Sequence, residues 1–413
     1  MHRKIEEYVR GLGLDAYAVG GAVRDELLGL EPKETDFLVP GVDHASLRTA
    51  LEPHGRVEDL EVAGQLVGIR LYPREREIRA IASAGIELAP PRAERSTGPG
   101  RHEFVIVADP SIPVEEDMRR RDFTVNAMAR RLETGEIVDP FGGRSDLERR
   151  ILRTVTPRSF AEDPLRLVRG LRFVSQLDLD PDEQTLAQMR AEAPSVKLVS
   201  GERIGGGLRD DGLGELSKLL LGPHPAKALR IARDTGVLAE LIPELDRVEL
   251  EVVQRAADAG VSLPVRLAAL LRDEPVAGPV LRRLRYPTQL RDHVIRLCRA
   301  RGVSVDGPVD ELFARRFLRE HGDRLAFDLL DLKRAEDADI ERLRALLERE
   351  RSSPHHIRDL AVDGSDLIGL GFREGPALGR ALETLLDEVV ENPQLNKPDV
   401  LSRRAKELLE EAR

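Results

Sequence analysis

The pattern of hydrophobic and polar residues changes near residue 145 of the chain. Before it, short apolar runs separated by turn residues predict strands at 16–19, 37–39, 67–72, 78–82 and 104–108. A helix is predicted at 22–28, directly after two glycines that end the first strand. Segment 89–101 is rich in Pro, Gly and Arg, which favours a mobile loop, and a turn at 139–143 closes this mixed α/β unit.

From residue 144 onward the spacing of apolar residues predicts helices almost throughout. Residues 165–173 carry an apolar stripe with arginines on the other face, and a glycine-rich interruption at 201–214 follows. Further helical stretches are predicted at 216–245, 264–297, 309–350 and 355–413, with a linker at 352–354. The sequence therefore predicts an α+β protein, with an N-terminal mixed α/β domain followed by an all-helical remainder.

Composition places the chain among globular proteins of several compact units, because 41% of its 413 residues are hydrophobic. No apolar run is long enough to span a bilayer, and the start of the chain lacks the apolar core of a signal peptide. We therefore expect a soluble cytoplasmic protein with no membrane partner. The single cysteine, Cys298, excludes an internal disulfide and a zinc site made of several cysteines.

Charge gives a mixed indication about nucleic-acid partners. The net charge of −10, taken alone, argues against one. Arginines nevertheless cluster at 119–121, 149–153 and 166–172, whereas acidic residues are spread along the predicted helices, so a basic face can exist on an acidic protein. Aromatic residues make up only 3% and Trp is absent, so extensive stacking of bases on aromatic side chains is not expected.

The first candidate for chemistry is the string V-G-G-A-V-R-D at 19–25, between a predicted strand and a predicted helix. Gly20 and Gly21 would let the backbone approach a phosphate closely. The helix N-terminus and Arg24 would add positive potential toward a triphosphate. The same string also suits an ordinary strand-to-helix turn, and only the strings that follow favour a nucleotide.

Three acidic residues form the second candidate. Glu34 and Asp36 are two residues apart at the start of a predicted strand, so their side chains point to the same side, where two carboxylates suit Mg²⁺. Glu87 would add a third carboxylate from a neighbouring strand and complete a two-metal site, in which one metal activates a 3′-hydroxyl and the other holds a triphosphate. The alternatives are a solvent-facing acidic pair at a strand edge and an ordinary surface glutamate.

The third candidate is the string R-R-D-F-T-V-N-A at 120–127. Arg121 and its neighbouring arginine could neutralise a triphosphate, and Asp122 and Asn126 could recognise ribose hydroxyls or base edges. The alternative is a helix with a basic first turn. The string of eight residues is far more specific than the acidic pair alone.

The fourth candidate is E-D-P-L-R at 162–166, with arginines following it. Asp163, Arg166 and Arg169 have the spacing of residues near one face of a helix. An Asp–Arg pair offers acceptor and donor groups to the edge of an incoming base. The alternative is a ladder of ion pairs on a helix surface.

In this order the strings resemble class II CCA-adding enzymes, the bacterial and eukaryotic tRNA nucleotidyltransferases of the polymerase-β-like nucleotidyltransferase superfamily. The resemblance runs from Tyr17 to about Leu245 and is carried by V-G-G-A-V-R-D-E-L-L-G, R-R-D-F-T-V-N-A-M-A, D-P-F-G-G and E-D-P-L-R-L-V-R-G-L-R-F. It implies four domains: a catalytic nucleotidyltransferase head at 1–145, a helical neck at 146–215 that selects the base, a helical body at 216–351 and a helical tail at 352–413 that binds tRNA.

The resemblance also implies a role for each matching position. The metal-binding and catalytic carboxylates would be Glu34, Asp36 and Glu87. The nucleotide-binding residues would be Gly20, Gly21, Arg24, Arg121, Asp122, Asn126, Asp163, Arg166 and Arg169, of which Asp163 and Arg166 read C or A by hydrogen bonds. The implied reaction is the addition of C, C and A to the 3′ end of tRNA from CTP and ATP, without a template and with Mg²⁺ as cofactor. No protein partner is evident.

Two departures from the family pattern leave alternatives open. The usual Asp-x-Asp is Glu34-Thr-Asp36 here, although the longer Glu can still present oxygens to Mg²⁺. Where some relatives carry a His-Asp pair, this chain has Leu270-Leu-Arg-Asp273, so no phosphohydrolase metal site is predicted. The alternatives are a CC-adding or A-adding enzyme or a poly(A) polymerase, and, because of Glu34, a catalytically impaired RNA-binding protein of the same fold.

Overall fold

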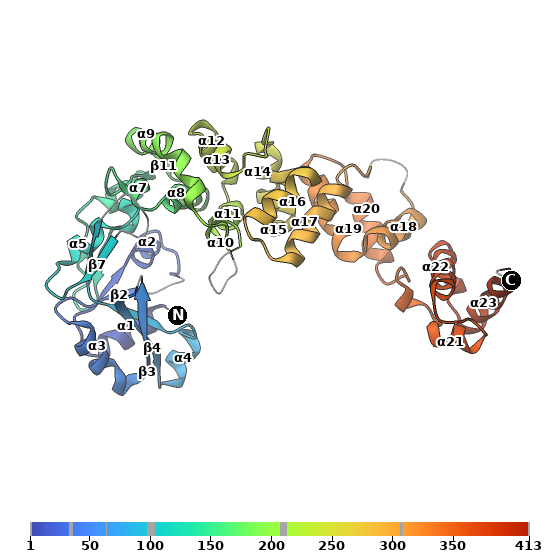
Figure 1. Ribbon diagram of the computed structural model, residues 1–413, viewed down its shortest axis with the longest axis horizontal. Coiled ribbons are helices and arrows are strands. Elements are labelled where there is room, and N and C mark those ends of the chain that lie inside the picture. Colours follow the sequence, from blue (N-terminus) through green and yellow to red (C-terminus); the bar gives the residue numbers. More distant parts are fainter. Residues whose placement is uncertain are drawn as a thin grey trace. The chain divides into compact units, whose positions relative to one another are not determined.

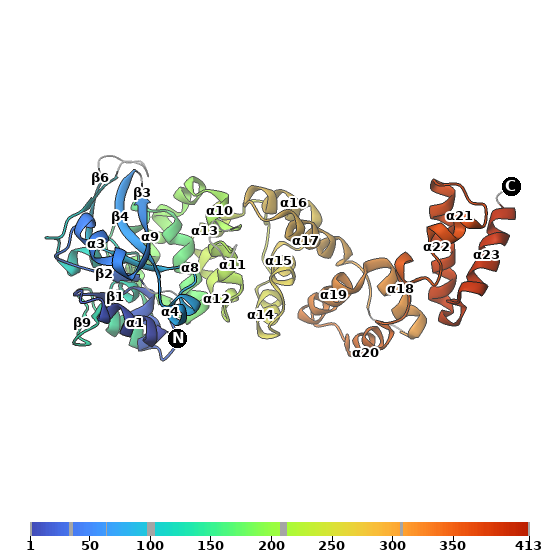
Figure 2. The ribbon, with the colours of Figure 1, turned by 90° about the horizontal axis from the view of Figure 1, so that it is seen from below.

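A computed structural model describes residues 2–32, 36–62, 64–96, 104–206, 213–305 and 309–411 of the chain. The chain forms two compact units, Met1–Pro243 and Glu244–Arg413. The first contains the β-sheet and is drawn in blue to green in Figure 1, and the second is helical and drawn in yellow to red. Figure 2 shows the same ribbon turned by 90°.

A mixed seven-stranded sheet with the order β3-β4-β5-β2-β1-β8-β9 forms the centre of the first unit. Its strands β2 and β5 run parallel, and the other neighbours in the sheet run antiparallel. The strands of this sheet are β1 Tyr17–Val19, β2 Asp36–Leu38, β3 Gly55–Val62, β4 Gln65–Pro73, β5 Ile86–Ala89, β8 Ala129–Arg131 and β9 Ile137–Val138. Two smaller pairs are β6 Arg92–Ser96 with β7 Phe104–Ala108, and β10 Ile151–Leu152 with β11 Asp180–Pro181.

Helices surround this sheet and continue into an all-helical region. Those of the first unit are α1 His2–Gly11, α2 Gly21–Leu27, α3 His44–Leu51, α4 Arg76–Ile81, α5 Val114–Arg119, α6 Gly143–Glu148, α7 Ser159–Glu162, α8 Leu165–Leu177, α9 Glu183–Glu192, α10 Gly201–Ile204, α11 Glu215–Leu220, α12 Pro225–Asp234 and α13 Val237–Leu241. Three short 3₁₀ helices are η1 Glu52–His54, η2 Thr124–Asn126 and η3 Ala193–Leu198. Together with the sheet, they give the predicted mixed head and helical continuation.

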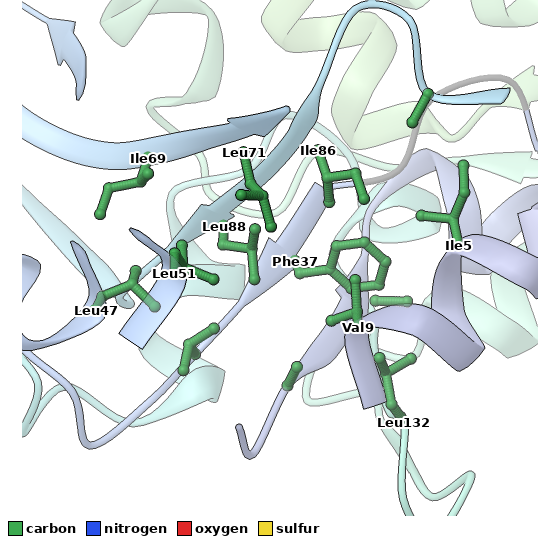
Figure 3. Close-up of a cluster of buried hydrophobic side chains, with 14 of the residues drawn as sticks. Ile5, Val9, Phe37, Leu47, Leu51, Ile69, Leu71, Ile86, Leu88 and Leu132 are labelled. Atoms are coloured by element: carbon green, nitrogen blue, oxygen red, sulfur yellow. The ribbon is translucent and has the colours of Figure 1, made fainter. Parts of the chain in front are cut away.

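One face of the sheet is buried against α1 and α3. Ile69 and Leu71 on β4 and Ile86 and Leu88 on β5 are at most 1% exposed and pack with Phe37 of β2. Figure 3 shows these side chains gathered in one cluster with residues of both helices. Since successive strand residues point to opposite faces, the residues between them lie on the other face of the sheet.

The helix α8 joins the helical region to the sheet-containing head. Its apolar stripe is buried, as the sequence pattern predicts, and it contacts α11 and α12. Gly170 allows a close approach to the head, because a Cβ atom there would lie 2.9 Å from Cζ of Phe123. Phe123 also meets Phe173 of α8 edge-on, with ring centroids 5.8 Å apart.

The second unit is built from helices alone within its described residues. They are α14 Leu250–Asp258, α15 Leu263–Leu271, α16 Glu274–Arg283, α17 Thr288–Ala300, α18 Glu311–His321, α19 Asp323–Ala335, α20 Glu341–Glu350, η4 Ile357–Asp359, α21 Gly364–Gly369, α22 Pro376–Glu391, η5 Pro393–Leu395 and α23 Pro398–Glu411. Every residue of α15 is buried, as expected for a helix at the centre of a bundle. Residues from 360 to 405 form a separate apolar cluster around α22.

The predicted fold class is confirmed, but several elements differ from the sequence-based expectation. Residues 78–82 were predicted as a strand and form most of the helix α4, because the apolar residues Ile78, Ile81 and Ala82 have helical spacing. The segment predicted as a mobile loop contains the strand β6, and its residues 97–101 lie outside the described part. None of the described helices is long and apolar enough to cross a membrane.

Candidate active site

Two of the three predicted metal-binding carboxylates lie side by side on the sheet. Asp36 of β2 is directly opposite Glu87 of β5 in the parallel register, so both side chains point to the face away from the apolar cluster. Asp36 is exposed and Glu87 is half-buried. Glu34 lies outside the described residues. Among those described, no group of three acidic, His or Cys residues could hold a metal, but two carboxylates on one face fit a hard divalent cation.

Gly20 leaves room for an arginine at the end of β1. Its φ is +67°, and a Cβ atom there would lie 2.5 Å from Nη1 of Arg121. Arg121 donates a hydrogen bond of 3.2 Å to the buried Asp117. Burial lowers the pKa of Arg121, whereas Asp117 and Asp36 raise it. The guanidinium therefore lies against the glycine turn and interacts electrostatically with Asp36 of the acidic pair.

Arg24 points from α2 toward the string at 120–127. It donates to Oδ1 of Asn126 at 2.6 Å and to Oδ1 of Asp25 at 2.6 and 2.9 Å. A Cβ atom at Gly21 would lie 3.5 Å from Nη2 of Arg24, an ordinary van der Waals distance, so a small side chain would fit there. The structure thus brings the first and third candidate strings together.

Asp122 is the centre of a buried polar network. Its Oδ1 accepts from the backbone N–H of Phe123 at 2.9 Å and from Nδ2 of Asn126 at 3.0 Å. Its Oδ2 accepts from Nε and Nη2 of Arg169 at 2.9 and 2.7 Å. Burial alone would raise the pKa of Asp122, but Arg169, Asn126 and Arg166 hold it well below its usual range. Asp122 therefore links the head to α8 as a charged group.

An aromatic ring lies among the arginines. The guanidinium carbons of Arg24, Arg169 and Arg172 lie 5.2, 5.7 and 4.3 Å from the ring centroid of Phe173. Glu215 of α11 lies 2.9 Å from Nε of Arg172 and 3.6 Å from Nη1 of Arg169. Burial lowers the pKa of Arg172 to about 10, although Glu215 opposes this. Such a concentration of guanidinium groups suits a polyanionic ligand.

Arg166 and Arg169 lie on the helix α8, as the spacing predicts, but Asp163 does not. Asp163 is not inside a helix but ends α7, because Pro164 disfavours helical backbone at the residue before it. Its carboxylate pairs with Arg203 at 3.1 and 3.4 Å. Arg166 instead donates to the backbone oxygen of residue 120 at 2.6 Å and to Oγ of Ser159 at 2.9 Å. Each of the two predicted base-reading groups thus has a separate protein partner.

Known proteins match nearly the whole chain. Residues 16–153 match the family described as "Poly A polymerase head domain", residues 178–248 "Probable RNA and SrmB- binding site of polymerase A", and residues 266–405 tRNA nucleotidyltransferase domain 2. The chain is 33% identical over 337 residues to the Multifunctional CCA protein of Ralstonia nicotianae, which covers 70% of this chain and 72% of that protein. It is 34% identical over 336 residues to that of Azoarcus sp., covering 71% and 75%.

The structural comparison agrees with the sequence comparison. The fold is similar to that of the Bacillus stearothermophilus CCA-adding enzyme, solved in complex with CTP, with a TM-score of 0.76 and 27% identity. The similarity covers 99% of this chain and 97% of that one. The chain belongs to the CCA-adding nucleotidyltransferase family.

Membership in the CCA-adding family confirms the resemblance that the sequence motifs carried. Nucleotidyltransferases of this kind generally use a divalent metal ion, which the paired carboxylates of Asp36 and Glu87 fit. The roles of the individual residues stay predictions. Sequence reasoning did not assign a role to Phe173, Arg203 or Glu215; Phe173 is the last residue of the string at 162–173, whereas the other two lie well beyond it.

Proposed function

We propose that this chain adds C, C and A to the 3′ end of tRNA, using CTP and ATP. The observation that carries the proposal is the register of Asp36 and Glu87. Arg121 lies against Gly20, is held by Asp117, and its charge interacts with that of Asp36. This arrangement supplies carboxylates for a metal and, within electrostatic range of Asp36, a cation for a triphosphate. Family membership supplies the substrate class.

Glu34, Asp36 and Glu87 would hold the metal ion, which we take to be Mg²⁺. When bound, it would lower the pKa of the 3′-hydroxyl and hold the triphosphate. Arg121 and Arg24 would bind the phosphate oxygens, because the guanidinium group of each lies against a glycine of the turn, Arg121 against Gly20 and Arg24 against Gly21. Backbone N–H groups after Gly20 would add to this at the start of α2.

Base selection would fall to Asp163 and Arg166. Their present partners, Arg203 for Asp163 and Ser159 for Arg166, hold each group in a defined place. An incoming cytosine or adenine would have to exchange with at least one of these partners to be read by hydrogen bonds. Arg169, fixed by Asp122, would keep the adjacent turn of α8 in position.

The four domains predicted from the sequence remain part of this proposal. We assign catalysis to 1–145, base selection to 146–215, structural support to 216–351 and tRNA binding to 352–413. The predicted cytoplasmic location also belongs to the proposal. A poly(A) polymerase, a CC-adding enzyme and an A-adding enzyme share most of these features, so product analysis must separate them.

The test is an incorporation assay with tRNA ending at the discriminator base, given CTP, ATP or both. Gain of C, C and then A, with no further addition, is the expected result. Addition of only C-C, or of A only to a C-C end, would replace the proposal by a division-of-labour enzyme. A long A tract would make the chain a poly(A) polymerase, and no incorporation would favour an RNA-binding protein impaired by Glu34.

The metal assignment has its own test in Asp36→Ala. We expect this variant to lose incorporation and to keep its fold, because Asp36 is exposed and is the first residue of β2. Asp15→Ala is the control, since Asp15 is also partly exposed and pairs with Arg131 of β8, which is separated from β2 by β1. Normal incorporation by Asp36→Ala would remove Asp36 from the metal site.

Base selection is tested with Asp163→Ala and Arg166→Ala. Each change removes one group that would read the base edge, so we expect more misincorporation between C and A than loss of stability. The ratio of kcat/KM for CTP and ATP at each position of the end would measure it. Unchanged ratios in both variants would show that Asp163 and Arg166 do not select the base.

A further inference from the structure

A cation stands in line with the acidic pair on the sheet. Arg70 of β4 is directly opposite Glu87 of β5, which is directly opposite Asp36 of β2. Residues in such a row point to the same face of the sheet. Figure 3 shows Leu71 and Leu88, the next residues along these strands, in the apolar cluster on the opposite face. The row therefore places the guanidinium of Arg70 next to Glu87, on the side away from Asp36.

Arg70 is ion-paired with the predicted third carboxylate. Its Nη2 donates to Oε1 of Glu87 at 2.5 Å. A guanidinium group is always charged in a protein, so this counter-ion is permanent. Glu58, opposite Arg70 on β3, instead accepts from the hydroxyl of Tyr72 at 3.0 Å. Of the two carboxylates beside it, Arg70 thus forms its ion pair with the one next to Asp36.

A glycine keeps this arginine in place. The turn before β5 has Gly85 with a φ of +88°, and a Cβ atom there would lie 2.5 Å from Cγ and 2.9 Å from Cδ of Arg70. The aliphatic stem of Arg70 lies against the backbone of this turn, where a side chain at 85 would displace it. The direction of Arg70 toward Glu87 is thus fixed by the backbone beneath it.

We propose that Arg70 is a competing counter-ion for Glu87, which weakens binding of a divalent cation to the acidic site before a nucleotide is present. The inference rests on the proposed function, because it takes Asp36 and Glu87 as the pair that holds the cation. A carboxylate oxygen that accepts from a guanidinium is a poorer metal ligand, and the guanidinium of Arg70 repels the divalent cation. A triphosphate brings its own negative charge and offsets that repulsion, so the metal enters with the nucleotide.

The experiment measures Mn²⁺ binding to the full chain without nucleotide, by the loss of the free-ion electron paramagnetic resonance signal. Arg70→Met is expected to bind Mn²⁺ roughly three- to ten-fold more tightly, the effect of removing one charge several ångströms from a divalent ion in partly screened solvent. Arg70→Gln should behave in the same way. Arg70→Lys keeps the charge and should stay close to the parent.

Arg56→Met is the matched control. Arg56 lies on the neighbouring strand β3 and stacks on Tyr72 at 3.9 Å, so its loss changes the net charge equally without touching Glu87. Its Mn²⁺ affinity should equal that of the parent. An equal gain in Arg56→Met and Arg70→Met would reduce the effect to net charge and overturn the competition.

Asp36→Ala separates failure of this inference from failure of the proposed function. If Asp36→Ala loses Mn²⁺ binding while Arg70→Met and Arg70→Gln bind no more tightly than the parent, the competition is wrong and the metal site stands. If Asp36→Ala binds Mn²⁺ as the parent does, the site itself is wrongly assigned and both fail. The inference is supported if Arg70→Met and Arg70→Gln both bind Mn²⁺ more tightly than the parent. The double variant that combines Arg70→Met with Asp36→Ala should lose this binding again.

Discussion

Asp122→Asn tests whether the buried ion pair with Arg169 joins the head to α8. Asparagine has nearly the same shape and can still accept from the N–H of Phe123 and from Asn126 through its oxygen. It removes the negative charge that faces Arg169 and places an amide N–H₂ group there instead. The change therefore isolates the charge of a group that is only 6% exposed.

The structure sets the expected magnitude. Arg169 donates two hydrogen bonds to Asp122, and bonds to charged groups contribute about 1.5–3 kcal/mol each. Breaking a buried pair by removing one partner costs about 3–5 kcal/mol. The side chain of Arg169 keeps 25% exposure, and Glu215 lies 3.6 Å away, so water and a second carboxylate recover part of this. We expect the free energy of unfolding to fall by about 2–3 kcal/mol.

The effect has a defined pH dependence. The folded pKa of Asp122 lies below its ordinary value of 3.8, so its charge contributes stability above pH 3.8. That contribution is lost as the pH falls from 3.8 toward the folded pKa. The difference in stability between the parent and Asp122→Asn should therefore be full at neutral pH and should shrink below 3.8.

Hydrogen exchange measured by mass spectrometry on the full chain gives this free energy locally, in peptides covering η2 and α8. Asp15→Asn is the matched control, because Asp15 accepts from Nε and Nη2 of Arg131 at 2.8 and 3.0 Å but is 40% exposed. An exposed pair of this kind contributes little to stability, because water screens its charges. Equal losses in the two variants would refute the reasoning that burial makes the Asp122 pair important.

Three further predictions follow from single residues. Gly20→Ala should displace the guanidinium of Arg121 and raise KM for CTP roughly ten-fold, as steady-state kinetics can measure. Gly13 has a similar φ of +72° and nothing within 4 Å of a Cβ atom, so Gly13→Ala should lose comparable stability and leave KM unchanged. Burial raises the pKa of Cys298 to about 12, so iodoacetamide at about pH 8 should alkylate it only after unfolding, as mass spectrometry can check. Burial lowers the pKa of His321 below 6.5, so the unfolded chain takes up a proton before the folded one and stability is lost as the pH falls below 6.5. The melting temperature of His321→Gln should therefore drop less on acidification than that of the parent.

The sequence predicts the parts of the site that depend on local rules. Two glycines after an apolar run correctly predict the turn between β1 and α2, and alternation along β4 predicts a strand there. The long strand β3 was not predicted, because Glu58, Asp59 and Glu61 are acidic and a bulge between Leu60 and Glu61 breaks the alternation. An edge strand with charged residues gives little periodic signal.

The sequence could not identify partners that are distant along the chain. Asp163 and Arg166 are close in sequence and were expected to present their polar groups from one helix face, yet Asp163 contacts Arg203, which is 40 residues away. Arg70 reaches Glu87 only because β4 and β5 pair in one register. Such contacts depend on tertiary packing, for which a single sequence carries no periodic signal.

The strand order also determines when the site can first exist during folding. Asp36 and Glu87 become neighbours only after β5 has entered between β4 and β2, so the pairing must bridge the whole intervening stretch of chain. The local hairpin of β3 and β4 can form early, whereas this parallel pairing has high contact order and is slow. A newly synthesised head would therefore be compact before it can bind a metal ion. The appearance of metal affinity during refolding would mark the moment at which β5 pairs with β2.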